Sequence, residues 1–106
     1  MKEDVIFEYH AHTLCAHLLC EVDHHKARHL RERIDEELYR QRPVVLALDF
    51  SGVPFMDSSG LALILGRAQS CTHIAASLRL EGLSAEQYRL LCLSGIESMK
   101  NITIIK

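Results

Sequence analysis

The chain has 106 residues, a formal net charge of −2 and 48% hydrophobic residues. This length suits one domain with its own core, so we expect residues 1–106 to form a single domain. Lys and Arg do not gather into the basic patch that nucleic-acid binding needs, so direct binding to nucleic acid is not expected. No apolar run is long enough to span a bilayer and no signal peptide is evident, which predicts a cytoplasmic protein without a membrane partner.

The first part of the chain predicts a hairpin followed by an amphipathic helix. In Val5–His10 the residues Val5, Phe7 and Tyr9 alternate with Ile6, Glu8 and His10, which is the periodicity of a strand. Leu14–Cys20 predicts a second strand, so a tight turn between the two gives an antiparallel pair. Asp23 is a candidate N-cap, and the helix ends before Pro43, whose ring disfavours helical geometry in the preceding residue. The apolar face of this helix consists of Ala27, Leu30, Ile34 and Leu38.

A buried strand, a loop and a second helix follow. The apolar run in Val44–Asp49 is short and continuous, as in a strand covered on both faces. The segment Asp49–Met56 contains Gly52 and Pro54 and predicts a loop, and a helix is expected over about Ser58–Thr72. The residues of this helix expected to face the sheet are Leu61, Ile64, Leu65 and Ala68.

The last part of the chain predicts a strand, a helix and a short strand. Ile74–Glu81 has the composition of a strand. Ser84 and Gln87 fit a capping box, and Gly95 is a natural C-terminal cap for the helix between them. Ile102–Ile105 completes the order β-β-α-β-α-β-α-β. This alternation predicts an α/β fold with a mixed β-sheet, an antiparallel edge strand and helices packed on the sheet. The inward residues of the third helix are expected to be Ala85, Tyr88, Leu91 and Cys92.

The sequence Asp57-Ser58-Ser59-Gly60 begins the second helix, just beyond the carboxyl end of the central strand. In open α/β sheets, binding sites lie at this edge. Asp and Ser are also preferred N-cap residues, because their oxygens accept the free N–H groups of the first turn. From the residues alone, helix capping is the preferred interpretation of both serines.

Two motifs give this chain a resemblance to a known family. The sequence FMDSSGLALILGR, residues 55–67, resembles the signature of bacterial anti-sigma factor antagonists, which belong to the STAS domain family. A second patch, Glu21-Val22-Asp23-His24-His25, matches upstream at the distance which that family uses. The resemblance is to the sporulation-type antagonist and covers almost the whole chain. It implies the STAS layout of the sheet described above.

The resemblance implies a phosphorylation switch. Ser58 matches the serine that an anti-sigma factor kinase phosphorylates, and a separate serine phosphatase would reset it. The unphosphorylated form would bind the kinase and release its sigma factor. A phosphate at a helix N-terminus meets free N–H groups, so it would change what docks there without refolding the domain. The residues expected to contact the partner are Glu21, Asp23, His24, Met56, Asp57, Ser58, Ser59, Gly60 and Leu63.

Several of these assignments have alternatives. Met56 and Leu63 either form an exposed apolar patch beside Ser58 or pack under neighbouring elements. Gly60 is expected to let a partner backbone approach closely. Cys20 stands where the family usually has Gly, which leaves the geometry of the Glu21 loop open. The family also commonly continues into a further C-terminal helix.

The sequence is also compatible with two other functions. A ligand- or nucleotide-sensing STAS module, and an antagonist that is never phosphorylated, remain alternatives. No nucleophile elbow, P-loop or dinucleotide fingerprint is present, so we expect neither an enzyme nor a cofactor. His25 and His29 are four residues apart, but no third ligand completes a metal site, and none is expected. The four cysteines lack C-x-x-C spacing and are expected to be buried free thiols.

Overall fold

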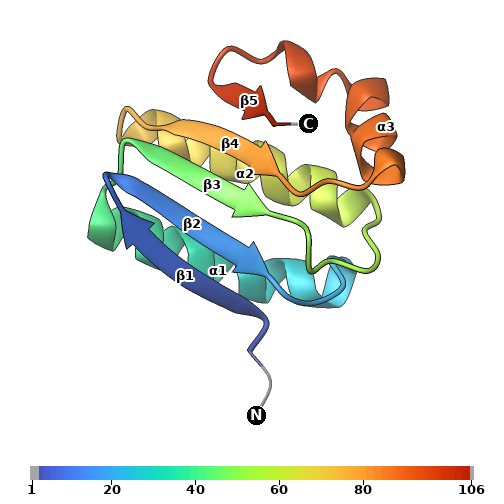
Figure 1. Ribbon diagram of the computed structural model, residues 1–106, viewed down its shortest axis with the longest axis horizontal. Helices are drawn as coiled ribbons and strands as arrows, with labels where there is room; N and C mark the ends of the chain where they lie inside the picture. Colours follow the sequence, from blue (N-terminus) through green and yellow to red (C-terminus); the bar gives the residue numbers. More distant parts are fainter. Residues whose placement is uncertain (1–2, 106) are drawn as a thin grey trace.

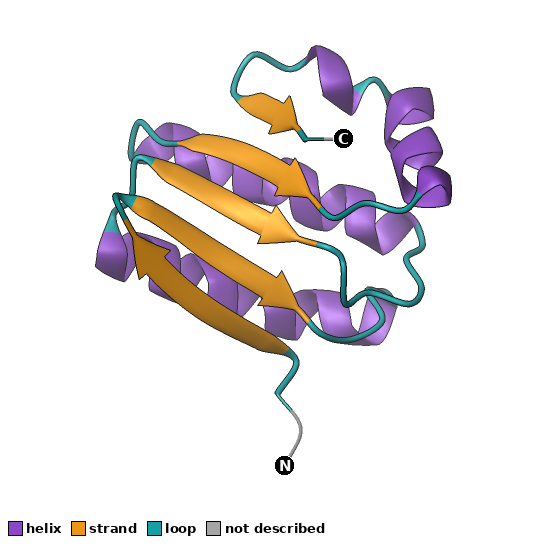
Figure 2. Cartoon of the chain, viewed as in Figure 1, coloured by secondary structure: helices purple, strands orange, loops and turns teal. Residues whose placement is uncertain are grey.

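The protein is described here by a computed structural model that covers residues 3–105 (Figure 1). Its sheet has five strands in the order β1-β2-β3-β4-β5. The strands are β1 (Val5–His10), β2 (Thr13–Leu18), β3 (Val45–Asp49), β4 (Ser77–Glu81) and β5 (Ile102–Ile104). The helices are α1 (His24–Gln41), α2 (Ser58–His73) and α3 (Ala85–Ser94), with a 3-10 turn at Ile96–Ser98. Figure 2 shows the same layers coloured by secondary structure.

The direction of the strands confirms the expected fold class. β1 is antiparallel to β2, and every other neighbouring pair is parallel. The hairpin turn uses Ala11 and His12 at φ of 51° and 63°, so two residues other than glycine adopt the left-handed region here. Because β2, β3 and β4 run in the same direction, the loops that follow them meet at one edge of the sheet.

The core lies between the sheet and two of the helices. α1 and α2 lie side by side behind the sheet in Figure 1, while α3 lies near β5. In β2 the burial alternates strictly, with one side of the strand facing the helices. α1 begins at the N-cap Asp23, which accepts a hydrogen bond from the Lys26 N–H (2.9 Å). It buries Leu30, Ile34 and Leu38 of its expected apolar face, while Ala27 is only partly buried. These packed layers hold the ends of the strands in fixed positions.

Five strand boundaries differ from the expectation. β2 begins at Thr13 and ends at Leu18, β3 begins at Val45, and β5 ends at Ile104. β4 begins at Ser77 and not at Ile74, because Ile74 is the C-cap of α2 and Ala75 adopts φ of 58° in the following turn. An apolar run that crosses a helix end and a turn has the composition of a strand without its geometry.

The prediction of which α2 residues are buried was also partly wrong. Ile64 and Ala68 are buried as expected, but Leu65 is 43% exposed and Leu61 is only partly buried. Leu63, expected off this face, is 3% exposed. The reason is that α2 packs against both the sheet and α1, so its buried arc is wider than a single stripe.

α3 and the cysteines need smaller corrections. The capping box of Ser84 and Gln87 and the C-cap Gly95 are confirmed. Leu91 is buried, but the inward residue of the first turn is Gln87, whereas Ala85 is exposed. Only Cys71 of the four free cysteines is buried, and this burial raises its pKa to about 11. The other three thiols are partly exposed.

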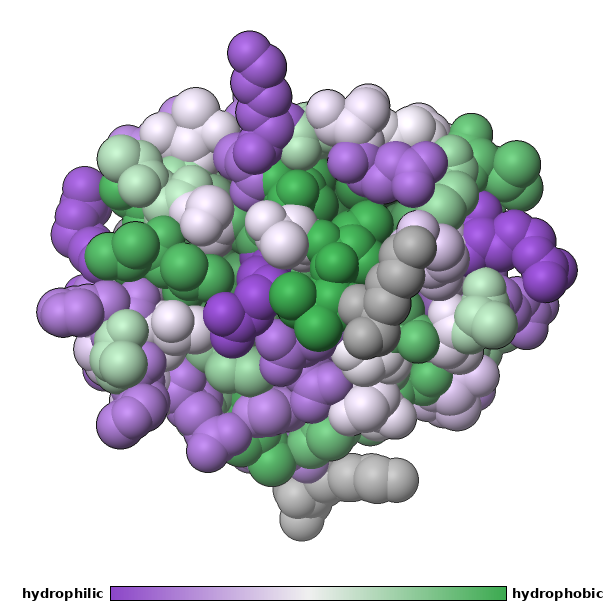
Figure 3. Space-filling model, turned by 45° about the horizontal axis from the view of Figure 1, so that its top comes forward, coloured by the Kyte–Doolittle hydropathy of each residue, from purple (hydrophilic) through white to green (hydrophobic). Residues whose placement is uncertain are grey.

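The other face of the sheet is polar and centres on His17. Its Nδ1 lies 2.7 Å from Asp49 Oδ2, and its Nε2 lies 2.5 Å from Glu8 Oε1. A carboxylate only accepts, so both ring nitrogens must donate, and His17 is an imidazolium that joins β1, β2 and β3. The hydrogen bonds that His17 donates to Asp49 and then to Glu8 raise its pKa above 6.5. Figure 3 shows hydrophilic residues mixed with apolar ones on this side of the molecule.

This contact predicts a pH-dependent stability. Because the folded-state pKa of His17 is raised, its contribution is complete below about pH 6.5 and is lost as pH rises through the folded-state value. Urea unfolding should show that His17→Gln costs more stability at about pH 5.5 than at about pH 8.5. The exposed His10→Gln variant is the control and should show no such difference. An equal cost of His17→Gln at both pH values would contradict the imidazolium assignment.

Candidate functional site

The site is built where two loops pair at the carboxyl edge of the sheet. Val22, between β2 and α1, forms an isolated parallel bridge with Met56, between β3 and α2. The Val22 N–H donates to the Phe55 carbonyl oxygen at 2.9 Å, and the Asp57 N–H donates to the Val22 oxygen at 3.3 Å. The bridge brings the N-termini of α1 and α2 together. The acidic patch around Glu21 and the serine motif at Ser58, which the sequence treats separately, therefore form one surface.

The loop before α2 is also held from its other side. Phe50 and Val53 are buried, so the loop is anchored by apolar side chains. Gln87 of α3 donates through Nε2 to the Val53 carbonyl oxygen (3.2 Å), while its Oε1 accepts from the Ser84 N–H (2.9 Å). The capping-box glutamine therefore links α3 to the loop that carries the serine motif.

Asp57, and not a serine, caps α2. Its Oδ1 accepts a hydrogen bond from the Ser59 N–H at 2.7 Å. Ser58 is the first helical residue and is exposed, and within residues 3–105 its hydroxyl has no hydrogen-bond partner. The interpretation that both serines only cap the helix is therefore wrong. The Ser58 hydroxyl is free to react or to contact another molecule.

A hollow of about 520 Å³ lies beside Ser58, between the loop and α3. Phe55 is 53% exposed and Leu93 is 82% exposed on its walls, and Leu90 packs partly against the core. Arg89 also lines it, so a cationic side chain shares the hollow with the serine. Exposed aromatic and aliphatic side chains around a recess are typical of a surface that binds another protein.

The acidic loop around Glu21 lies beside the loop that carries the serine motif. Glu21 and His24 are exposed, while Asp23 is partly buried as the N-cap of α1. Cys20 does not adopt a positive φ, so the loop needs no glycine there. Lys26 bonds Asp4 at 3.1 Å, and this hydrogen bond raises the pKa of Lys26. The first turn of α1 is thus tied to the segment ahead of β1.

Three expected contact residues are buried. Met56 is 9% and Leu63 is 3% exposed, so for both the packing alternative is confirmed. Gly60 is buried, and a Cβ there would lie 2.2 Å from Met56 Cγ. Glycine at this position therefore makes room for Met56 inside the protein, and the expectation that it admits a partner backbone is wrong.

The exposed apolar residues beside Ser58 were missed. Met56 and Leu63 were expected in this role, whereas Phe55, Leu90 and Leu93 form the open surface. The sequence gives only a weak signal for these residues, because the third helix shows no clear apolar stripe around Leu93. Only the pairing of α3 with the loop through Gln87 brings these residues next to the serine.

No residue set in the described part of the chain forms a metal site. Residues 3–105 contain no group of three or more His, Cys, Asp or Glu side chains that could hold an ion. His29 lies 4.0 Å from Asp4 and not in a cluster with other potential ligands. None of the helices in the same residues is both long and apolar enough to cross a membrane.

The fold and the paired loops define an α/β domain that presents a helix N-terminus and an apolar recess to other molecules. The chain belongs to the STAS domain family, whose model matches residues 5–104. It is similar to an anti-sigma F factor antagonist of Paenibacillus polymyxa, with 31% identity over 96 residues, 91% of this chain and 82% of the relative. It is also 31% identical to an anti-sigma-B factor antagonist of Listeria monocytogenes over 77% of this chain and 71% of that protein.

Solved structures agree on the fold. The anti-sigma factor antagonist SpoIIAA in its unphosphorylated form matches with a TM-score of 0.78 and 24% identity, over 96% of this chain and 88% of its own. The Thermotoga maritima protein TM1081 matches with a TM-score of 0.83 and 16% identity, over 96% and 86%. Both confirm the layout expected for an antagonist of the STAS family.

The packing of Gly60 predicts opposite effects at two glycines of α2. Gly60→Ala should lower the free energy of unfolding by about 1–3 kcal/mol, because the methyl group of the alanine would overlap Met56 in a filled core. Gly66→Ala is the matched control. Its Cβ would meet nothing within 4 Å, so the variant should stabilise by about 0.5–1 kcal/mol through helix propensity. Urea unfolding measures both.

A second-site variant checks the cause. Met56→Ala removes the atoms that the new methyl group would meet, so Gly60→Ala should cost less in that background. If Gly60→Ala costs the same with and without Met56, the glycine is not serving this contact.

Proposed function

We propose that this chain is an anti-sigma factor antagonist that Ser58 phosphorylation switches off. In its unphosphorylated form it binds an anti-sigma factor kinase and so releases the sigma factor that the kinase holds. A serine phosphatase restores the active form. The curated relatives carry the name of such antagonists, and SpoIIAA has been solved in both unphosphorylated and phosphorylated forms.

The observation that carries this proposal is the state of the Ser58 hydroxyl. It is exposed at the first position of α2, while Asp57 alone supplies the cap. A kinase can therefore approach this oxygen without opening the helix. The neighbouring serine differs, because the backbone N–H of Ser59 is held by Asp57 and its side chain is partly buried.

The expected effect of the phosphate is electrostatic. A phosphoserine carries a charge of about −1.5 to −2, which the positive end of the α2 dipole tolerates. On the surface it adds to the charges of Asp57 and Glu86 around the same hollow. It also places a hydrated group beside Phe55, whose apolar ring would otherwise be covered by the partner. Both effects weaken docking while leaving the fold intact.

The partner surface is proposed to extend across both loops. Glu21, Asp23 and His24 lie on the first loop and the start of α1, which the Val22–Met56 bridge holds beside Ser58. The chain itself performs no chemistry in this scheme, since the kinase supplies ATP and the phosphoryl group. Met56, Gly60 and Leu63 act from beneath the surface by fixing the start of α2.

A kinase assay tests the site. The purified chain is incubated with an anti-sigma factor kinase from the same genome and MgATP, and the products are weighed by mass spectrometry. The wild type and the matched control Ser59→Ala should each gain one phosphoryl group, whereas Ser58→Ala should gain none. Equal modification of Ser58→Ala would show that another hydroxyl is the acceptor.

A binding assay tests the switch. Ser58→Asp places a carboxylate where the phosphate would be, so it should bind the kinase at least about tenfold more weakly than Ser58→Ala does. Calorimetry measures both affinities in the presence of ADP. If Ser58→Asp and Ser58→Ala bind the kinase equally well, charge at this position does not control docking.

A further inference from the structure

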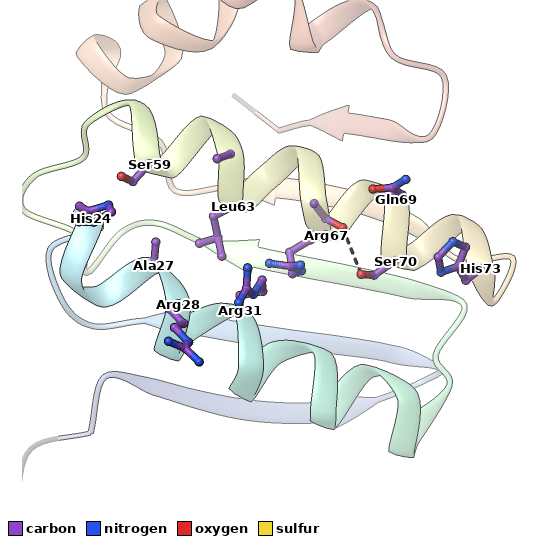
Figure 4. A pocket seen from close by; sticks show the side chains of 12 residues that line it. His24, Ala27, Arg28, Arg31, Ser59, Leu63, Arg67, Gln69, Ser70 and His73 are labelled. Atoms are coloured by element: carbon purple, nitrogen blue, oxygen red, sulfur yellow. Dashed lines mark hydrogen bonds between the residues drawn. The ribbon is translucent and has the colours of Figure 1, made fainter.

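A second hollow lies on the outer side of the two helices that cover the sheet. It has a volume of about 550 Å³ and runs between α1 and α2, from Ser59 at one end to His73 at the other (Figure 4). Its small residues, Ala27, Ala62, Gly66 and Ser70, come from both helices. A Cβ at Gly66 would meet nothing within 4 Å, so the groove is open at this point.

The groove is positively charged in a chain whose formal net charge is −2. Arg28, Arg31 and Arg67 line it together with two histidines, and no Asp or Glu is among the lining residues. Arg28 lies 3.5 Å from Glu32 on its own helix. Arg31 has no ion-pair partner within the described residues 3–105.

Arg67 is the unusual member of this set, because it is only 3% exposed. Its Nε faces Asp35 Oδ1 at 2.8 Å, and its Nη2 donates to Asp35 Oδ2 at 3.2 Å. Its buried Nη1 has no acceptor in the part of the chain that the structure describes. A buried donor without a partner costs about 1–3 kcal/mol, so an acceptor supplied from outside would be favourable.

Arg31 lies close enough to Arg67 for its charge to act on it, and within the described residues only Arg67 of the two has a carboxylate partner. Figure 4 shows both side chains projecting into the space between α1 and α2. Burial lowers the pKa of Arg67, the charge of Asp35 opposes this, and the nearby charge of Arg31 lowers the pKa further. Two neighbouring guanidinium groups with a single carboxylate, the Asp35 side chain paired with Arg67, leave room for a second anion.

The shape of the groove selects the kind of anion. His24, Arg28 and Arg31 are spaced along one side of α1 by four and three residues, which corresponds to about 10 Å at 1.5 Å per residue. A single phosphate would contact one point of this row. A helix with carboxylates one turn apart follows the whole row, and the small residues let its backbone approach.

We propose that the α1–α2 groove binds an acidic helix of a partner protein, with one of its carboxylates bridging Arg31 and the Nη1 group of Arg67. The other carboxylates of that helix pair along Arg28 and His24. This site is separate from the hydroxyl of Ser58, which lines the other hollow. It requires neither ATP nor phosphorylation.

The test uses a synthetic peptide as the probe. An acetylated peptide of roughly 18 residues, made of Ala with Glu one helical turn apart, is long enough to form some helix in water. It is titrated into the isotope-labelled protein without kinase or nucleotide and followed by NMR. The shift changes should map to α1 and α2 along the groove. The same peptide with Gln in place of Glu should bind at least about tenfold more weakly.

Matched variants separate the groove from general attraction. Arg31→Glu should lower the affinity of the protein for the Glu peptide at least about tenfold. Arg40→Glu should leave this affinity within about twofold of the wild-type value. Arg40 is exposed on the same helix, outside the groove, so the two variants change the net charge equally. Circular dichroism confirms that each variant is folded.

The proposal is overturned by any of three results. In the first, the Gln peptide binds the protein as tightly as the Glu peptide does. In the second, the Arg31→Glu variant binds the Glu peptide as tightly as the Arg40→Glu variant does. Inorganic phosphate or ATP alone could bind the same residues more tightly than the Glu peptide, which would make the groove a phosphate site. Because Ser58 is not used, these results are independent of the kinase assay.

Discussion

The pairing of Val22 with Met56 is the contact on which the site depends. Two hydrogen bonds at 2.9 and 3.3 Å join loops that follow neighbouring parallel strands. They fix the distance between the first turns of α1 and α2, and with it the position of Ser58 beside the acidic loop. Gln87 holds the same loop from α3. A serine at a flexible loop tip would need ordering by each partner, whereas here the surface is formed in advance.

Much of this architecture could be predicted because local patterns agree with one another. The alternation in Val5–His10, the cap at Asp23 and the box at Ser84 each specify an element and its boundary. The order of the elements then restricts the sheet to few topologies. The bridge between Val22 and Met56 has no such local signal. Each residue looks like an ordinary apolar loop position, and only the folded sheet brings the loops together.

The errors concentrate on α2, for a physical reason. Its residues 61–65 are all apolar, so no single stripe stands out, and contacts with α1 decide which of them are buried. Leu65 and Leu63 exchanged their expected roles in this way. Arg67 was not singled out, because a charged residue in a helix is normally exposed. Its burial against Asp35 depends on where the two helices cross.

The central claim is that Ser58 can receive a phosphate without a change of fold, because Asp57 already satisfies the helix terminus. The most direct measurement is an amide NMR comparison of the unmodified chain with one carrying genetically encoded phosphoserine at position 58, without any kinase. The account predicts shift changes limited to the two paired loops, the first turns of α1 and α2, and the facing side of α3. Shift changes that extend through the strands of the sheet would contradict it, since the phosphate would then be remodelling the domain.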